Sequence, residues 1–207
     1  MFEGSHSRDV GVETPDGRLL ISDGGVNVDF RLDEVPGVET ITPQGVAGWI
    51  WTRKQGGISS SGVIDVPGRR FEVEAPAIVD DSAGYHSRHT NWRWSSGVGK
   101  LSDGRAVAWN FVNGMHDLPG ASEQTVWIEG IAHEVPTCRI STDLSNIAFP
   151  TGERLDFHEE AVRGHYENRI VVRSRYAQPF GRFSGRIPHA GSLASGLGVM
   201  ETHSVVW

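Results

Sequence analysis

Alternation of apolar and polar side chains is the dominant pattern along this chain. Between positions 26 and 33, apolar residues occupy the even positions and polar residues the odd ones. A period of two is typical of a β-strand with one buried face. Comparable segments occur at 89–100, 105–112, 124–128, 132–140, 168–176 and 198–206. Asp103-Gly104 and Glu129-Gly130 fall between two of these pairs and indicate hairpin turns.

The spacing of these segments predicts the fold class. Roughly a dozen short strands separated by turn signals indicate an all-β protein, here an antiparallel barrel that is closed or nearly closed. Only residues 158–167, which include Glu159, Glu160 and Ala161, favour helix, so at most one short helix is expected. No linker, repeat or charge block divides the sequence. Residues 1–207 are therefore predicted to form a single β-barrel domain.

Composition and charge narrow the function classes. The 26 glycines fit a chain with many tight turns, and the net charge of −7, without a basic stripe, argues against nucleic-acid binding. The single cysteine, Cys138, excludes an intramolecular disulfide and fits a reducing compartment. Residues 1–16 show no secretory signal, and no run of 18 apolar residues occurs. A cytoplasmic protein without a membrane partner is expected.

Aromatic residues gather on neighbouring predicted strands. In an extended segment, Trp92 and Trp94 share one face, and Trp109 and Trp127 lie on the next two strands. If the hairpins pair in sequence order, rings from three strands can meet around one hollow. Aromatic walls with a few polar groups are typical of small-molecule sites, so the pattern predicts a pocket for a small apolar molecule. The alternative is a packed aromatic core.

Candidate acid–base groups lie near the same segments. Glu201 and His203 share one face of the last strand, about 7 Å apart, with apolar neighbours on that face. Burial would raise the carboxyl pKa and lower the imidazole pKa unless the two groups pair. Such groups could move protons on a bound alkene or ketone, and a structural ion pair is the alternative. His86 and His89 fall on opposite faces of a strand, so no metal site is expected.

Several motifs point to a family. From Asp81 onward, the chain contains the following motifs, in this order: Asp81-x-x-Gly84-Tyr85-His86, Thr90-x-Trp92-x-Trp94, Trp109-Asn110, Ser122-Glu123, Val126-Trp127, Ser174-x-Tyr176-x-Gln178-Pro179-Phe180-Gly181 and Gly198-Val199-Met200-Glu201-x-His203. On these motifs it resembles the uncharacterised bacterial family named for the domain of unknown function 2804. That family is similar in layout to lipocalin-like carotenoid hydratases and cyclases, two-part β-barrel proteins that act on isoprenoid or polyketide substrates without a cofactor. The resemblance implies a lipocalin-like barrel, a terpenoid-like or polyketide-like ligand and no cofactor. Its motifs add Asn110 and Tyr176 to the four tryptophans as predicted ligand-binding residues.

The resemblance leaves the activity open. Members of these families carry more β-structure ahead of the shared region, whereas 80 residues precede Asp81 here, so a single barrel is expected, with a homodimer partner as a candidate for completing it. One hypothesis is a cofactor-free hydratase, isomerase or cyclase. Its predicted catalytic residues converge on a cavity floored by Trp92, Trp94 and Trp109, and they are Tyr85, His86, Glu123, Glu201 and His203. The alternatives are a non-catalytic binder or carrier, and a structural β-domain with a packed interior.

Overall fold

The computed structural model describes residues 10–13, 17–44, 48–118, 121–169 and 173–206. All regular secondary structure in these ranges is β-strand, and every pairing is antiparallel. The described ranges hold no helix with the length and apolar character needed to cross a lipid bilayer. The predicted all-β, antiparallel, lipocalin-like fold class is confirmed.

The chain divides into two compact units. Unit 1 comprises Met1–Pro36 and Ile58–Ala77, and unit 2 comprises Gly37–Gly57 and Ile78–Trp207. Two long strands run from one unit into the other, because β5 spans Gly48–Val66 and β6 spans Arg69–Gly84. The single barrel domain expected over residues 1–207 stays a prediction.

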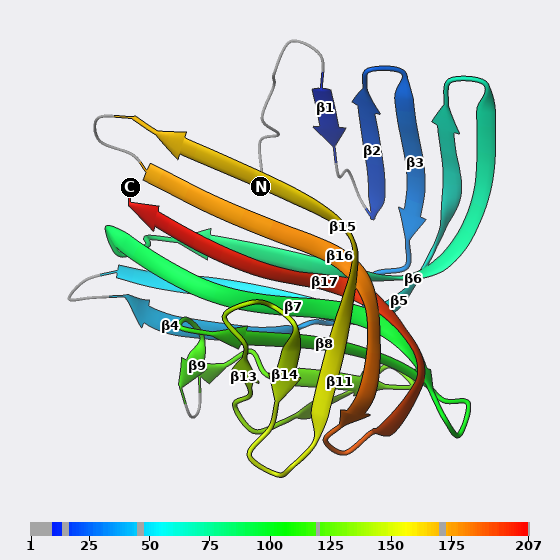
Figure 1. Cartoon of the computed structure of the whole chain (residues 1–207). Helices are drawn as coiled ribbons and strands as arrows, with labels where there is room; N and C mark the ends of the chain where they lie inside the picture. The colour runs from blue at the N-terminus through cyan, green and yellow to red at the C-terminus, as the bar shows by residue number, and fades with distance from the viewer. Residues whose placement is uncertain (1–9, 14–16, 45–47, 119–120, 170–172, 207) are drawn as a thin grey trace. The chain divides into compact units, whose positions relative to one another are not determined.

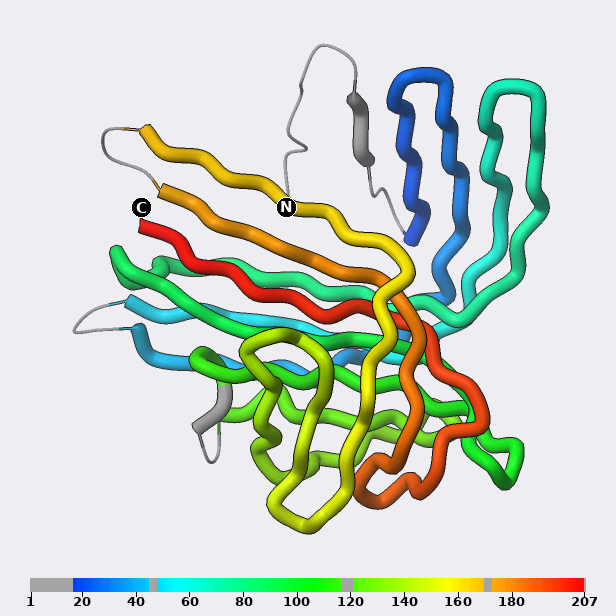
Figure 2. Tube along the Cα trace, viewed as in Figure 1, coloured from blue at the N-terminus to red at the C-terminus, as the bar shows by residue number. Residues whose placement is uncertain are grey.

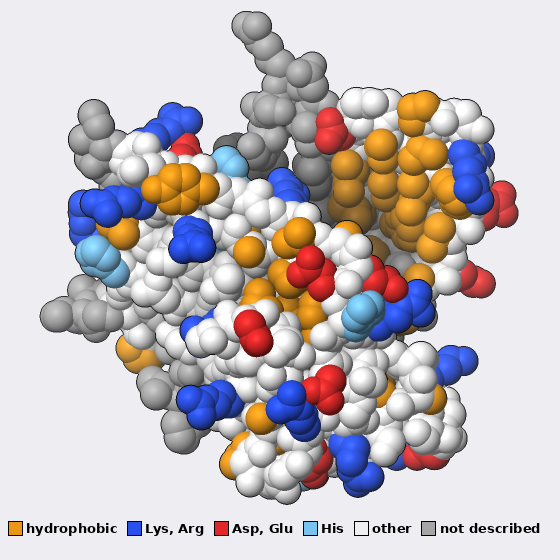
Figure 3. Space-filling model, viewed as in Figure 1, with side chains coloured by type: hydrophobic (Ala, Val, Ile, Leu, Met, Phe, Trp, Pro, Cys, Tyr) orange, Lys and Arg blue, Asp and Glu red, His pale blue; other side chains and the backbone are white. Residues whose placement is uncertain are grey.

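Unit 1 is built from hairpins. Its strands are β1 (Val10–Glu13), β2 (Arg18–Asp23), β3 (Val26–Leu32), the second part of β5 and the first part of β6. They pair in the order β1-β2-β3-β5, with β6 on β5. The sequence pattern predicted β3 at residues 26–33, one residue beyond its observed end at Leu32. Figure 3 shows hydrophobic side chains gathered on one face of β2, β3 and the β5–β6 hairpin.

Unit 2 contains a sheet of nine strands. Their order is β12-β11-β8-β7-β17-β16-β15-β14-β13, and their bounds are β7 His89–Leu101, β8 Ala106–Asn113, β11 Thr125–Ile128, β12 Ile131–Glu134, β13 Arg139–Ile140, β14 Asn146–Ala148, β15 Arg154–Asn168, β16 Arg173–Ile187 and β17 Gly191–Val206. The long strands bend strongly, and the sheet curls into a half-barrel (Figures 1 and 2). Register shifts between Glu159 and Ala161 in β15 and between Arg182 and Arg186 in β16 accompany this curvature.

One face of this sheet, called the core face below, carries the apolar core. The core face bears Trp109 and Phe111 of β8 and Met200 of β17, all fully buried. Phe183 of β16 meets the Trp109 ring edge-to-face at 5.0 Å. Gly97 of β7 lies opposite Trp109, and a Cβ atom at this glycine would stand 2.2 Å from the indole. The curled sheet therefore wraps around aromatic side chains.

The opposite face of the sheet, called the cavity face below, is covered by other strands of unit 2. These are β4 (Val38–Gln44), the first part of β5 and the last part of β6, and the short strands β9 (Asp117–Leu118) and β10 (Ala121–Ser122) pair beside them. The Thr40 hydroxyl of β4 donates to the Ser122 carbonyl at 3.2 Å. A Cβ atom at Gly56 of β5 would stand 2.2 Å from the Trp127 ring, so side chains fill the space between the layers there.

The helix expected within residues 158–167 is wrong. These residues belong to β15, which pairs with β16 along its whole length. Helix propensity differs by only a few tenths of a kcal/mol between such residues, so it is a weak determinant. Backbone hydrogen bonding to β16 across the hairpin outweighs the preference of Glu159, Glu160 and Ala161 for helix.

Candidate functional site

A cavity of about 340 Å³ lies between the cavity face and the covering strands of unit 2. Strands β5, β6, β7, β8, β16 and β17 all contribute to its wall. Apolar and aromatic side chains alternate there with titratable ones. The lining residues are Ile50, Thr52, Lys54, Asp80, Ser82, His86, Trp92, Trp94, Val112, Met115, His116, Glu123, Gln178 and Glu201.

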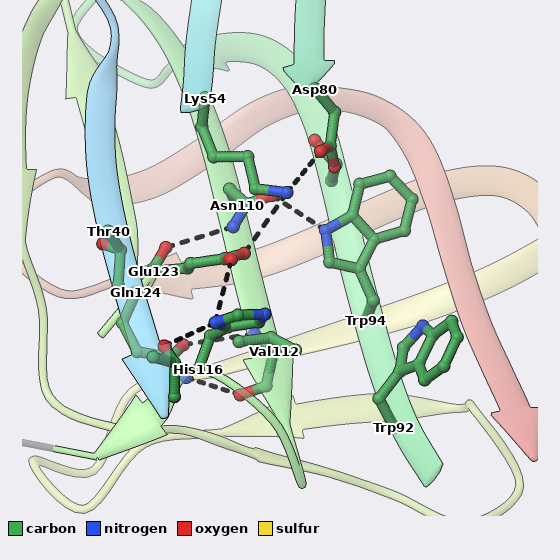
Figure 4. Close-up of polar contacts among 12 residues, drawn as sticks. Thr40, Lys54, Asp80, Trp92, Trp94, Asn110, Val112, His116, Glu123 and Gln124 are labelled. Carbon is green, nitrogen blue, oxygen red and sulfur yellow. Dashed lines mark hydrogen bonds and ion pairs between the residues drawn. The ribbon is translucent and has the colours of Figure 1, made fainter. Parts of the chain in front are cut away.

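A buried lysine organises one end of the cavity (Figure 4). Lys54, only 5 % exposed, follows Ile50 and Thr52 on the same side of β5. Its ammonium group contacts the carboxylate of Asp80 on β6 and lies 3.3 Å from Oε2 of Glu123. A buried cation needs paired charges, and two carboxyl groups supply them here.

The contacts continue from Glu123 to a buried histidine. Nδ1 of His116 lies 3.6 Å from Oε1 of Glu123 and 2.6 Å from the Thr42 hydroxyl of β4. The Glu123 backbone carbonyl accepts a 3.1 Å hydrogen bond from Asn110, whose side-chain oxygen accepts one from Trp94 Nε1 at 2.8 Å. Side chains from both layers are thereby fixed in one network, as Figure 4 shows.

A second carboxyl group lies on β17 and has neutral partners. Glu201 accepts 2.7 Å and 2.9 Å hydrogen bonds from Trp92 Nε1 and Gln178 Nε2, one on each oxygen. The Tyr176 hydroxyl also bonds to this carboxyl group. Pairing of Glu201 with Trp94 and of His203 with Trp92 across β17 and β7 puts these side chains on the cavity face.

Burial sets the protonation of both carboxyl groups. It raises the pKa of Glu201, against the opposing effect of the hydrogen bonds from Trp92 and Gln178, and the Asp80 charge raises it further. Burial also raises the pKa of Asp80, although Lys54 opposes this. Because 35 % of the Asp80 side chain remains accessible, water reaches this carboxyl group. The cavity can therefore hold a proton on a carboxyl group above its ordinary pKa.

Burial likewise raises the pKa of Tyr176 to about 12, and Glu201 adds to that effect. The phenol therefore stays protonated at neutral pH and can donate to Glu201. The pKa of His86 is lowered by burial, and so is that of His203. Neither imidazole then adds positive charge to the site at neutral pH.

The structure brings five of the sequence-predicted residues to the cavity wall: His86, Trp92, Trp94, Glu123 and Glu201. Four more lie on the same face next to it. Asn110 and Tyr176 hydrogen-bond to wall residues, and His203 packs edge-on against Trp92 at 4.5 Å while its Nε2 lies 2.9 Å from the Ser174 hydroxyl. Trp127 packs against Gly56 beyond the cavity end.

Two predicted residues lie elsewhere. Trp109 does not floor the cavity, because it points from β8 to the core face and is fully buried there. Alternation places Trp92 and Trp94 on one face of β7. Trp109 pairs with Gly97, whose odd position belongs to the other face of β7, so the Trp109 side chain lies on the face opposite to Trp92 and Trp94. Tyr85 is 70 % exposed and packs edge-on against Trp49, at 6.0 Å between ring centroids, so it does not reach the cavity.

Sequence reasoning missed Lys54 and Asp80. A signal for Lys54 exists, because Lys54 shares one face of β5 with Ile50 and Thr52, and both of these residues are buried. A lysine on such a face requires a buried counter-charge. Asp80 carries no comparable signal, since its pairing partner lies 26 positions earlier and is brought close only by the β5–β6 hairpin.

Among the described residues, no three His, Cys, Asp or Glu side chains are grouped so that they could hold a metal ion. His89, considered with His86 as a ligand pair, is exposed on the first residue of β7.

The profile of DUF2804, described as a domain of unknown function, matches residues 2–207. No curated protein sequence matches the chain. Kievitone hydratase from Nectria haematococca aligns with a TM-score of 0.49 and 10 % identity, over 99 % of this chain and 70 % of that one. A candidate ATTH from Nitrosomonas europaea aligns with a TM-score of 0.43 and 14 % identity, over 94 % and 68 % of the two chains.

Proposed function

This chain belongs to the DUF2804 family, and we propose that it binds a small, largely apolar molecule in the cavity of unit 2. The observation that carries the proposal is the cavity itself, an unfilled space of about 340 Å³. Ligand sites in proteins begin at roughly this size, about 300 Å³. Trp92, Trp94, Val112 and Met115 offer apolar contact, and a terpenoid-like or polyketide-like body suits such walls.

Ligand binding also explains the polar groups in the wall. A purely structural interior would be packed to crystal-like density, and charged groups in it would be costly. Here Lys54, Glu123 and Glu201 are all buried against a space that apolar side chains do not fill. A few fixed polar groups in an apolar wall are what orients a bound molecule.

We further propose acid–base catalysis on the bound molecule, with Glu201 as the proton donor. Burial raises its pKa and so favours the protonated form, and Trp92, Gln178 and Tyr176 hold the carboxyl group in place. Proton donation to a carbon–carbon double bond begins a hydration, isomerisation or cyclisation. A carrier without catalysis needs the same cavity but not the proton on Glu201.

Titration with a neutral apolar fluorophore, N-phenyl-1-naphthylamine, tests the binding proposal. We expect saturable one-to-one binding to the wild type. Val112→Phe should weaken it by at least about tenfold, because the larger side chain occupies part of a space of about 340 Å³. Val162→Phe, the same substitution at an exposed position of β15, should leave binding unchanged.

Met115→Phe fills the cavity from another wall position and serves as a second variant if Val112→Phe loses its folded far-UV spectrum. Absence of saturable binding to the folded wild type would contradict the proposal, and so would equal binding by both filled variants. For catalysis, Glu201→Gln should reduce turnover of a substrate by about 10²-fold or more, as loss of a general acid does. Unchanged turnover would leave the chain as a binder.

A further inference from the structure

We infer that the ligand of this cavity carries a positive charge, as a protonated amine on an apolar body. The inference rests on the proposed binding function and names the chemical class of its ligand. It follows from the charges and unfilled acceptors in the cavity wall.

The charges in the wall do not balance. The described residues lining the cavity include three carboxyl groups, on Asp80, Glu123 and Glu201, against one lysine, Lys54. His86 is neutral near pH 7 because burial lowers its pKa, and His116 adds charge only if protonated. With all carboxyl groups ionised and both imidazoles neutral, three negative charges face one positive charge.

The lysine compensates only one end of the cavity. Lys54 contacts Asp80 and lies 3.3 Å from Glu123. Within the described residues, Glu201 accepts hydrogen bonds from the neutral donors of Trp92, Gln178 and Tyr176. Ionisation of Glu201 therefore leaves a buried negative charge without a nearby cation, and the protein meets this cost by raising the pKa instead.

Two buried oxygen atoms in the wall can each accept a hydrogen bond from a ligand. The Thr52 hydroxyl and Oε1 of Glu123 make no hydrogen bond within the described residues, although both side chains are only 3 % exposed. Buried polar atoms are nearly always hydrogen-bonded in native proteins, by the chain itself, by water or by a ligand. An ammonium group brings three N–H donors, whereas a carboxylate brings none.

Aromatic side chains favour the same ligand class. The N–H groups of Trp92 and Trp94 are directed to Glu201 and Asn110, which fixes both rings in the cavity wall. The face of an indole ring attracts a cation placed against it. An anionic ligand would meet like charge from each ionised carboxyl group in the wall.

Three compounds of similar size and different charge test the inference: 2-phenylethylammonium, 2-phenylethanol and 3-phenylpropionate, titrated calorimetrically at pH 7. We expect the ammonium compound to bind at least about tenfold more tightly than the alcohol, with the carboxylate weakest. Binding of the cation should also release protons from the cavity carboxyl groups, because a nearby positive charge lowers a carboxyl pKa. The measured heat should therefore differ between phosphate and Tris buffers.

Variants separate the cavity charges from the net charge of the protein. Glu201→Gln and Glu123→Gln should each reduce the preference for ammonium over alcohol by about fivefold or more, whereas Glu159→Gln, an exposed change on β15, should not. If the alcohol binds as tightly as the cation, the inference is overturned while the proposed binding function stands. If a filled variant such as Val112→Phe binds the cation as well as the wild type does, the site lies elsewhere and both fail.

Discussion

At the scale of single residues, Lys54 organises the charges at one end of the cavity. Its side chain is almost fully buried, and its ammonium group is shared between Asp80 and Glu123. A buried ion pair contributes little over an apolar pair of the same shape, but removal of one partner leaves an uncompensated charge. Replacing one charged residue of this site should therefore lower the free energy of unfolding by more than the intact ion pair contributes to it.

Lys54→Met should destabilise the protein by about 3 kcal/mol at pH 7, because two carboxyl groups lose their cation. Urea unfolding followed by far-UV circular dichroism measures the loss. Lys100→Met, at an exposed position on β7, is the matched control and should change stability by less than about 0.5 kcal/mol. Adding Glu123→Gln to Lys54→Met should recover part of the loss. A destabilisation no larger than that of the control would refute the buried pairing.

Glu201 should give the protein a measurable pH dependence. Its folded pKa is raised above the ordinary value of 4.5, so the folded state holds the proton more tightly than the unfolded state does. The resulting stability is present below pH 4.5 and is lost as the pH rises through the folded pKa. Glu201→Gln removes this dependence.

Urea unfolding of wild type and Glu201→Gln at pH 5, 6.5 and 8 tests whether Glu201 makes the stability depend on pH. We expect the stability of the variant, relative to wild type, to rise with pH across this range. Parallel stability curves would show that burial does not shift the pKa of this carboxyl group.

At the scale of elements, strands β7 and β17 contribute side chains to both faces of the sheet, the core face and the cavity face. Odd and even positions of β17 place Glu201 on the cavity face and Met200 on the core face, so a one-residue slip would exchange polar and apolar side chains. Gly97 of β7 matters for the same reason, since the Trp109 ring occupies the space where a side chain would project. The register of these strands is therefore fixed by packing on each side.

Gly97→Ala should destabilise the protein by about 1–3 kcal/mol, because the added methyl group overlaps the Trp109 ring at a position where the backbone cannot easily move. Gly164→Ala on β15 is the matched control. Near that glycine a Cβ atom would meet only the Tyr176 carbonyl oxygen, at 3.5 Å, so the change should be nearly neutral. Thermal unfolding of both variants measures the difference. Equal melting temperatures would contradict the close approach.

At the scale of the whole molecule, the chain passes twice between its two units through continuous strands. Strands β5 and β6 each contribute residues to unit 1 and to unit 2. Unfolding of one unit would break the backbone pairing at the end of the other. A single cooperative transition is therefore expected, in accord with the predicted single domain.

Two spectroscopic signals can test this coupling. All seven tryptophans belong to unit 2, so their fluorescence reports that unit, whereas far-UV circular dichroism reports strands of both. We expect urea transitions from the two signals to coincide. Phe30→Ala, on β3 of unit 1, should shift both midpoints together. A shift in circular dichroism alone would show that unit 1 unfolds independently.

The sequence by itself determined many of the strands and hairpins and the shared face of Trp92 and Trp94, because these follow from local alternation and turn chemistry. It did not determine β15, where local preference favoured helix. It also indicated Glu123, Glu201, Trp92 and Trp94, whose residue types stand out beside apolar positions. The register between neighbouring strands decided which side chains share a face of the sheet. Because of this register, Trp109 lies on the core face and not in the cavity. Only the tertiary structure paired Lys54 with Asp80 and Glu123, since charges distant in sequence meet only when strands from different parts of the chain are packed together.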